Sequence, residues 1–191
     1  MRKLVYYIGV SLDGYIAGPG GEVDFYPTPP EYVEWMMEEF PDSIPTHLRA
    51  HFGMDPALPA QRWDTVLMGR GTYVLPDEHI ESPFSHLKQY VVSSSLAQSE
   101  HPGVEIFSGD PVDLVRELKG EREGADIWLC GGGNLAGQLI DEIDEMVVKS
   151  YPVIAGSGVP AFHGVFKPTN FRPVRRKEFG NGAQVTWFER A

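Results

Sequence analysis

The chain has little cysteine, few basic residues and no long apolar run. Cys130 is the one cysteine among 191 residues, which excludes an internal disulfide and a cysteine-based zinc site. No apolar run reaches the ~18 residues that a membrane-spanning helix requires, and the residues after Met1 do not have the pattern of a signal peptide. From these absences we expect a reducing, cytoplasmic location and no membrane partner.

Negative charge dominates the composition, with 27 acidic residues against 16 lysines and arginines and a formal net charge of −11. A nucleic-acid partner requires a basic face, so we expect none. A small anionic ligand is still compatible with this charge, because it needs only a few local donors. His47 and His51 are the one histidine pair at a metal-ligand spacing, and they lack an acidic third ligand, so we expect no metal.

Apolar segments that alternate with helical patterns predict one α/β domain over residues 1–191. The length and the 42% hydrophobic content are sufficient for a substantial core. Strands are expected at 4–10, 65–68, 88–92, 104–107, 126–130 and 146–148. Helices are expected after a Thr28 cap, over 46–52, after an Asp110 cap and after the glycines at 131–133. The pattern ends in a hairpin, residues 171–179 and 183–189 around Gly180-Asn181-Gly182, and predicts a mostly parallel, helix-covered sheet with an antiparallel hairpin.

The glycine turn 131–133 is the most informative motif for function. It follows an apolar strand, and Asn134 and Leu135 open an apolar helical pattern. Glycines let backbone amides approach a ligand closely, and a helix N-terminus favours phosphate. The alternative is a turn that only packs against its sheet. The spacing of Gly131, Gly133 and Ala136 also matches a dinucleotide fingerprint, but it occurs late in the chain and no ribose-binding acid follows, so we reject a Rossmann fold.

Two further strand ends carry groups suited to a nucleotide. Gly69-Arg70-Gly71-Thr72 offers a guanidinium, a hydroxyl and accessible amides, and Ser93-Ser94-Ser95 offers hydroxyl donors. Taken singly, Arg70 could form a surface salt bridge and the serines an ordinary loop. Ligands of open α/β sheets bind outside the carboxyl ends of the strands, so the three motifs together indicate a dinucleotide site.

Five segments, in this order, resemble the dihydrofolate reductase-like superfamily, in the branch of the reductase domain of the bifunctional riboflavin biosynthesis protein. They are SLDGYIAG (11–18), DTVLMGRGTY (64–73), YVVSSSL (90–96), IWLCGGGNLAGQLI (127–140) and DEIDEMVVKSYPVIAGSGVPAF (141–162). The resemblance implies a three-layer fold with a mixed sheet of about eight strands, an NADPH-dependent reductase and a homodimer.

The resemblance also implies roles for particular residues. Gly69, Arg70 and Thr72 would hold the cofactor diphosphate, and Ser93 and Ser94 would meet its 2′-phosphate side. Gly131, Gly132, Gly133, Asn134 and Leu135 would wrap the diphosphate and nicotinamide ribose, with a cis bond frequent in the glycine pair. Ala17 and Ile16 would lie against the nicotinamide ring.

The substrate side departs from the patterns of known relatives. Dihydrofolate reductases have a buried acid on the first helix, where this chain has Tyr32; riboflavin-pathway reductases usually have a lysine and a glutamate, where this chain has Tyr7 and Cys130. Asp13 and Asp24 are the candidate catalytic acids. The alternative for Asp13 is a structural role, in which it stabilises its own turn. We expect an NADPH-dependent reductase of a small heterocyclic or carbonyl substrate, similar to 5-amino-6-(5-phosphoribosylamino)uracil reductase. Alternatives are a dihydrofolate reductase and a non-catalytic NADP-binding protein.

Overall fold

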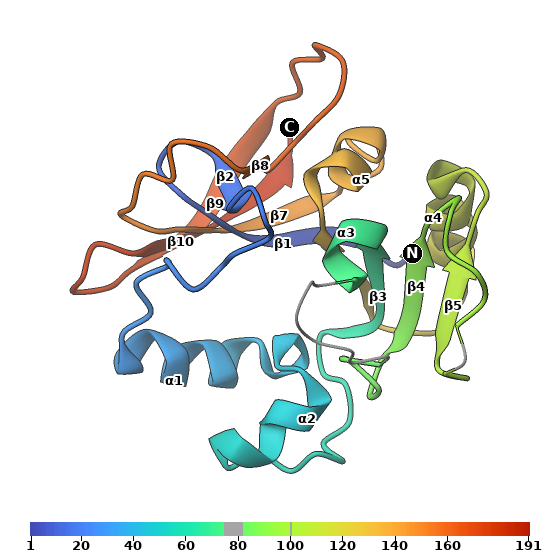
Figure 1. Cartoon of the computed structure of the whole chain (residues 1–191), viewed down its shortest axis with the longest axis horizontal. Helices are drawn as coiled ribbons and strands as arrows, with labels where there is room; N and C mark the ends of the chain where they lie inside the picture. The colour runs from blue at the N-terminus through green and yellow to red at the C-terminus, as the bar shows by residue number, and fades with distance from the viewer. Residues whose placement is uncertain (75–81, 100) are drawn as a thin grey trace.

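The fold is organised around one large mixed sheet. The computed structural model describes residues 1–74, 82–99 and 101–191. Eight strands form the sheet in the order β5-β4-β3-β6-β1-β7-β10-β9, in which β10 runs antiparallel to both of its neighbours and the other pairs are parallel. The predicted mostly parallel sheet with a C-terminal antiparallel hairpin is confirmed (Figure 1).

The strands of the large sheet have the following bounds: β1 Leu4–Val10, β3 Trp63–Gly69, β4 Lys88–Val92, β5 Val104–Phe107, β6 Asp126–Gly131, β7 Glu145–Ser150, β9 Phe171–Glu178 and β10 Gln184–Arg190. The α-helices are α1 Pro30–Glu39, α2 Thr46–Arg49, α3 Arg70–Tyr73, α4 Pro111–Gly120 and α5 Gly133–Gln138, with short 3₁₀ turns at Pro41–Ser43 and Ala50–Phe52.

Helices cover both faces of the sheet, as predicted. On one face Tyr32 of α1 packs in an aromatic core with Tyr7 and Trp128. On the other face Leu114 of α4 and Leu135 of α5 pack in an aliphatic core. Both cores exist because neighbouring residues of a strand point to opposite faces, so continuous apolar strands such as β1 supply side chains to each.

One local prediction needs correction. Thr28 does not cap α1; the N-cap is Pro29, without a side-chain hydrogen bond. Tyr32 of α1 is fully buried, and Val33 and Met36 pack against the same core. The helix after the glycine turn is short and ends at Gln138, and the fully buried Leu139 follows it in a turn. By contrast, the Asp110 cap is confirmed, because its carboxylate accepts a hydrogen bond from the Val112 amide at 2.8 Å.

A second, two-stranded sheet lies over the carboxyl end of β1. It pairs β2 (Tyr15–Ala17) with β8 (Val159–Pro160) in an antiparallel arrangement. The sequence predicted only a glycine-rich loop over residues 11–26. A three-residue strand flanked by glycines has too little periodicity to be recognised, and its partner is more than 140 residues away in the sequence.

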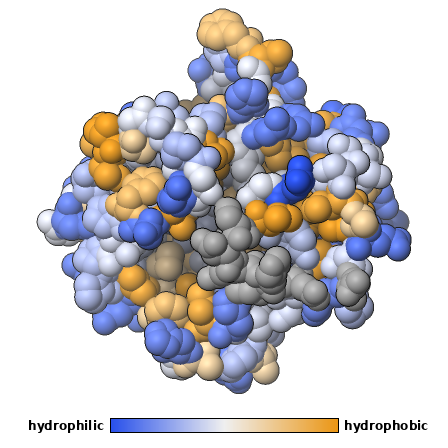
Figure 2. Space-filling model, viewed as in Figure 1, coloured by the Kyte–Doolittle hydropathy of each residue, from blue (hydrophilic) through white to orange (hydrophobic). Residues whose placement is uncertain are grey.

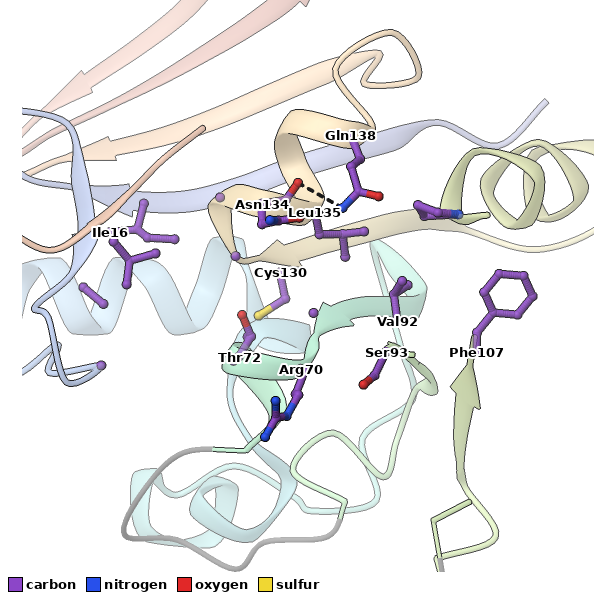
Figure 3. Close-up of a pocket in the computed structure, with 18 of the residues that line it drawn as sticks. Ile16, Arg70, Thr72, Val92, Ser93, Phe107, Cys130, Asn134, Leu135 and Gln138 are labelled. Atoms are coloured by element: carbon purple, nitrogen blue, oxygen red, sulfur yellow. Dashed lines mark hydrogen bonds between the residues drawn. The ribbon is translucent and has the colours of Figure 1, made fainter. Parts of the chain in front are cut away.

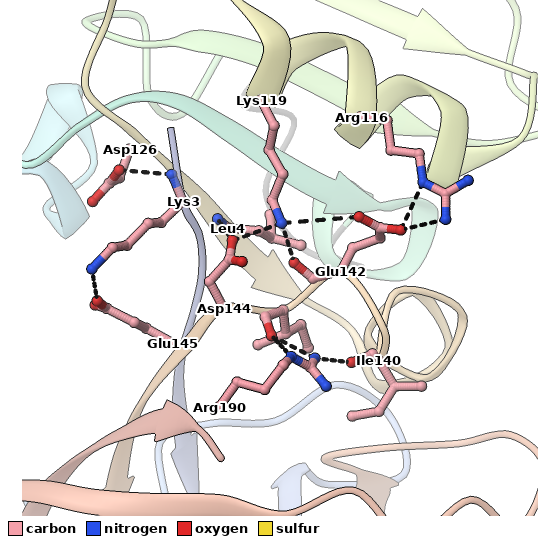
Figure 4. Close-up of polar contacts among 11 residues, drawn as sticks. Lys3, Leu4, Arg116, Lys119, Asp126, Ile140, Glu142, Asp144, Glu145 and Arg190 are labelled. Carbon is pink, nitrogen blue, oxygen red and sulfur yellow. Dashed lines mark hydrogen bonds and ion pairs between the residues drawn. The ribbon is translucent and has the colours of Figure 1, made fainter. Parts of the chain in front are cut away.

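Ion pairs and capping hydrogen bonds fix the edge of the sheet where β1 begins (Figure 4). Asp144 accepts from the Leu4 amide at 2.7 Å and pairs with Lys119 at 2.7 Å. Lys119 also donates to the backbone oxygen of Glu142, and Arg190 donates to that of Ile143. Structural contacts therefore occupy the end of the sheet where β1 begins. A ligand would bind at the opposite end, where the parallel strands have their carboxyl ends.

The surface in Figure 2 intersperses hydrophilic and hydrophobic residues. The most exposed large apolar residues besides Met1 are Val165 and Phe166, in the segment between β8 and β9. Within the described ranges, no helix is both long enough and apolar enough to cross a bilayer.

Candidate functional site

A cavity of about 670 Å³ lies at the carboxyl ends of five strands of the large sheet. Its wall includes Ile8 of β1, Gly69 of β3, Val92 of β4, Phe107 of β5 and Cys130 of β6 (Figure 3). The cavity therefore occupies the position expected for a ligand of an open α/β sheet.

The cavity brings together most of the residues predicted to bind a cofactor. The ones that line it are Ala17, Gly69, Arg70, Thr72, Ser93, Ser94, Gly132, Gly133, Asn134 and Leu135. Gly131 is not part of the wall, but a Cβ on it would lie 3.7 Å from the Thr72 hydroxyl. The three strand-end motifs of the sequence thus converge on one site. Whether these residues hold a cofactor stays a prediction.

The glycine turn serves two purposes at once. The expected cis bond is present between Gly131 and Gly132. A Cβ on Gly132 would stand 3.5 Å from the Thr72 hydroxyl and 3.8 Å from the Ile16 side chain, at the cavity wall. A Cβ on Gly133 would instead lie 2.0 Å from the backbone oxygen of Pro160. Gly133 is therefore required for packing, whereas Gly132 keeps the wall open.

A cation and backbone donors belong to the cavity lining. Arg70 begins α3, is exposed, and forms no ion pair with any residue that the structure describes. The salt-bridge alternative is thus not seen for Arg70. The first-turn amides of α5 have no partners within the helix, as at any helix start. Asn134 is held by Gln138, whose side-chain amide donates to its oxygen at 2.6 Å.

The three serines after β4 are not equivalent. Ser93 is buried, and its hydroxyl oxygen accepts from the amides of Ser95 and Leu96 at 3.2 and 3.1 Å. Ser94 and Ser95 are exposed and line the cavity. Ser93 therefore stabilises the turn, and the hydroxyls beside it are available to a ligand.

Sequence reasoning missed a fourth strand end at the cavity. Phe107 ends β5, and Ser108 and Gly109 follow it; all three line the wall together with Pro111 of α4. The same signal that identified the other motifs, small residues directly after a strand, is present here. The signal is weak, because a single serine and glycine before a helix cap are common in loops.

Comparison with known proteins identifies the family of this chain. The model of the RibD C-terminal domain matches residues 2–185. The chain belongs to the RibD C-terminal domain family. Two relatives are YwjB and YyaP of Bacillus subtilis (strain 168). YwjB is 30% identical, with 96% of each chain covered; YyaP is 29% identical, with 95% of this chain and 91% of YyaP covered.

Solved structures share the fold. A protein provisionally assigned to riboflavin biosynthesis, from Shewanella sp. PV-4, superposes with a TM-score of 0.71 at 23% identity, covering 100% of this chain and 99% of that one. The diaminohydroxyphosphoribosylaminopyrimidine deaminase/5-amino-6-(5-phosphoribosylamino)uracil reductase of Thermotoga maritima superposes with a TM-score of 0.62 at 17% identity, covering 100% of this chain and 57% of that one. The fold predicted from the sequence is confirmed, because both structures superpose over the whole of this chain.

The two candidate acids of this RibD C-terminal domain do not line the cavity. Asp13 is exposed, and its carboxylate accepts from the Ser11 hydroxyl and from the amides of Ala155 and Gly156. These hydrogen bonds, that from Ser11 foremost, lower the pKa of Asp13 to about 2. Asp24 is exposed in a turn. A catalytic acid at either position has no support in this geometry, and the contacts of Asp13 favour its alternative role in the loop.

Two tyrosines stand at positions where the resemblance seen in the sequence implied a charged group. Tyr32 is buried, and its hydroxyl lies 2.6 Å from that of Tyr151. Burial raises the pKa of Tyr32 far above its ordinary value. Tyr7 is also buried, and its hydroxyl has no hydrogen-bond partner among the residues that the structure describes. Burial raises the pKa of the Cys130 thiol to about 12, so these groups are neutral near pH 7.

Proposed function

We propose that this protein is an NADPH-dependent reductase of a small heterocyclic or carbonyl compound. The observation that carries the proposal is the convergence of the glycine turn, Arg70 and the exposed serines on one cavity at the carboxyl edge of the sheet. Membership of the RibD C-terminal family supports a reductase.

The residues at the cavity fit the chemical groups of NADPH. Arg70, Thr72 and the amides beside Gly132 suit the diphosphate, because charge-assisted hydrogen bonds and close backbone approach favour phosphate oxygens. Ser94 and Ser95 suit the 2′-phosphate, and the half-buried Phe107 ring offers an apolar surface for adenine. The cofactor would supply hydride, while the protein supplies its position against the substrate.

The nicotinamide end would lie near Ala17 and Ile16. Both residues belong to β2, which β8 holds in place over the end of β1. Cys130 is at the same wall. The substrate would therefore approach from the aromatic face of the sheet, beside Cys130 and Tyr7.

Substrate-dependent oxidation of NADPH tests the proposal. The probes are 5-amino-6-(5-phosphoribosylamino)uracil, dihydrofolate and a panel of small aldehydes and ketones. We expect turnover above ~1 per second with at least one heterocyclic or carbonyl probe, and loss of this turnover in Gly132→Val. Failure of NADPH to bind at all would overturn the proposal.

A non-catalytic NADP-binding protein is the second candidate. Three residues favour it. Tyr32, Tyr7 and Cys130 stand at the positions where the resemblance implies an acid, a lysine and a glutamate. All three are neutral near pH 7 because burial raises their pKa values. Binding of NADPH without oxidation of any probe would select this candidate. The homodimer, the single-domain organisation and the cytoplasmic location expected from the sequence stay predictions.

A further inference from the structure

Lys149 is a half-buried cation that the proposed function has not used. It is the fifth residue of β7, where it pairs with Gly9 of β1 on one side and Val185 of β10 on the other. Its ammonium lies 3.8 Å from the centroid of the Tyr7 ring. Lys149 is therefore on the aromatic face of the sheet, at the carboxyl end of the strand that neighbours β1.

The groups around Lys149 are polar but carry no negative charge near pH 7. Cys130 of β6, Tyr7 of β1 and Tyr151 after β7 face this region, together with Tyr26 from the segment after β2. Gly9 lies between them, since a Cβ on it would stand within 4 Å of the Tyr151, Tyr26 and Lys149 side chains. From β10 the facing residue is the uncharged Val185. Burial raises the pKa of Tyr26 to about 12 and raises those of Tyr7 and Tyr151 as well.

Lys149 has no carboxylate partner among the residues that the structure describes. Among the described residues, four lysines form ion pairs, namely Lys3, Lys88, Lys119 and Lys167. Lys149 and Lys177 form none, and each lies over aromatic rings. Lys149 differs from Lys177 in its neighbour, because it lies over Tyr7, which packs in the same core as Cys130 of the cavity wall. A partly desolvated, unpaired cation costs folding free energy, which is typical of functional sites.

We infer that Lys149 receives the reducible end of the substrate, donating a hydrogen bond to its oxygen or nitrogen and then a proton to that atom. This inference rests on the proposed function, and it narrows the substrate to a compound with a C=O or C=N bond whose heteroatom can accept from an ammonium group. Cys130, Tyr7 and Tyr151 would form the neutral surroundings of that bond.

The step balances as a two-electron reduction. The carbon of the C=O or C=N bond gains a hydride from NADPH, and the oxygen or nitrogen gains one proton from the Lys149 ammonium. The resulting neutral amine takes a proton from water before the next turnover. Burial lowers the pKa of Lys149 to about 8, which makes the ammonium a better proton donor at neutral pH than an ordinary lysine.

The first experiment measures Lys149 without turnover. Lysines are reductively methylated with isotope-labelled formaldehyde, and the Lys149 signal is identified by NMR as the one missing from Lys149→Met. We expect an apparent pKa near 8 for Lys149. Saturating NADP⁺ should change this pKa and leave the chemical shift of the Lys177 signal unchanged. If calorimetry on the same sample shows NADP⁺ binding and the Lys149 signal does not change, the inference is overturned and the proposed function stands. If NADP⁺ does not bind, the proposed function itself fails.

The second experiment applies to any probe that is turned over. We expect the wild type to lose activity above about pH 8 as Lys149 loses its proton. Lys149→Met should lower kcat by at least about 10²-fold and abolish this pH dependence. Lys149→Arg keeps the charge but cannot release the proton, so kcat should fall while KM stays within a few-fold. Lys177→Met is the matched control and should leave both constants in place. A full-rate Lys149→Met protein with an unchanged pH profile would overturn the inference.

Discussion

Asp13 and Gly156 connect two loops that lie far apart in the sequence. The Asp13 carboxylate accepts from the Gly156 amide at 2.7 Å and from the neighbouring Ala155 amide at 3.0 Å. The segment after β1 is thereby joined to the segment after β7. Gly156 has a φ of +77°, a backbone conformation that suits glycine and orients its amide.

Asp13→Asn should therefore weaken this connection without removing a catalytic group. An asparagine side chain can accept at one atom only, so one of the two backbone amides loses its partner. We expect turnover to stay within about fivefold of wild type, against the loss of roughly 10² or more that a general acid would produce. Steady-state kinetics on a probe that is turned over decides between the two roles, and a loss of the larger size would return Asp13 to catalysis.

The pH dependence of stability gives an independent check on Asp13. Its pKa is about 2 in the folded protein, below the ordinary value of 3.8. Its contribution to stability is therefore fully present above about pH 4 and is lost as the pH falls toward 2. The stability difference between wild type and Asp13→Asn should shrink over this range in acid titrations.

Gly132→Val should prevent NADPH binding and leave the fold intact. Its Cβ enters space bounded by Thr72 and Ile16, and the φ of Gly132 is −91°, which other residues adopt readily. Gly133→Ala is the contrasting variant, because its Cβ would collide with the Pro160 backbone oxygen. Circular dichroism and NADPH titration should show that Gly132→Val is folded but does not bind NADPH. The same measurements should show that Gly133→Ala is destabilised. Full NADPH affinity in Gly132→Val would mean that the turn serves packing alone.

Substitutions of the serines after β4 should have different effects on cofactor binding and on stability. Ser94→Ala with Ser95→Ala removes two cavity hydroxyls, and a hydrogen bond to a charged group contributes about 1.5–3 kcal/mol. We expect about tenfold or greater loss of NADPH affinity, with NADH affinity unchanged. Ser93→Ala removes the acceptor of two backbone amides, so thermal unfolding should show a loss of about 1 kcal/mol. Equal losses for both cofactors in the double variant would place the 2′-phosphate elsewhere.

Dihydrofolate should not be turned over at an ordinary enzymatic rate, above ~1 per second. Tyr32 occupies the helix position of the expected acid, and its hydroxyl is engaged with Tyr151. Burial keeps Tyr32 neutral and makes it a poor proton donor. A spectrophotometric assay with NADPH measures this, with NADPH binding verified in the same sample. Rapid reduction of dihydrofolate would show that another group supplies the proton.

Prediction from the sequence succeeded for elements whose residue pattern lies within one continuous segment. Residues 4–10, 88–92 and 104–107 were expected as strands and form β1, β4 and β5 with those bounds. The glycine turn and the Arg70 motif were recognised because each follows an apolar strand, and parallel strands bring such ends to one edge.

Features that depend on distant partners could not be predicted. The β2–β8 pair, the Asp13–Gly156 contact and the position of Lys149 over Tyr7 each join segments more than 130 residues apart. Lys149 in particular closes an apolar strand segment, Met146-Val147-Val148, where a lysine usually marks the solvent edge. Its lack of a carboxylate partner is visible only once the neighbouring strands are in place.

Titration of the purified protein with NADPH and with NADH tests the account most directly. Isothermal calorimetry would measure both affinities, with Gly132→Val as the control that has the same fold and a filled wall. We predict saturable NADPH binding at one site, at least about tenfold tighter than NADH, and none in Gly132→Val. Absence of NADPH binding to the wild type, or equal binding to wild type and Gly132→Val, would contradict the assignment of this cavity to the cofactor.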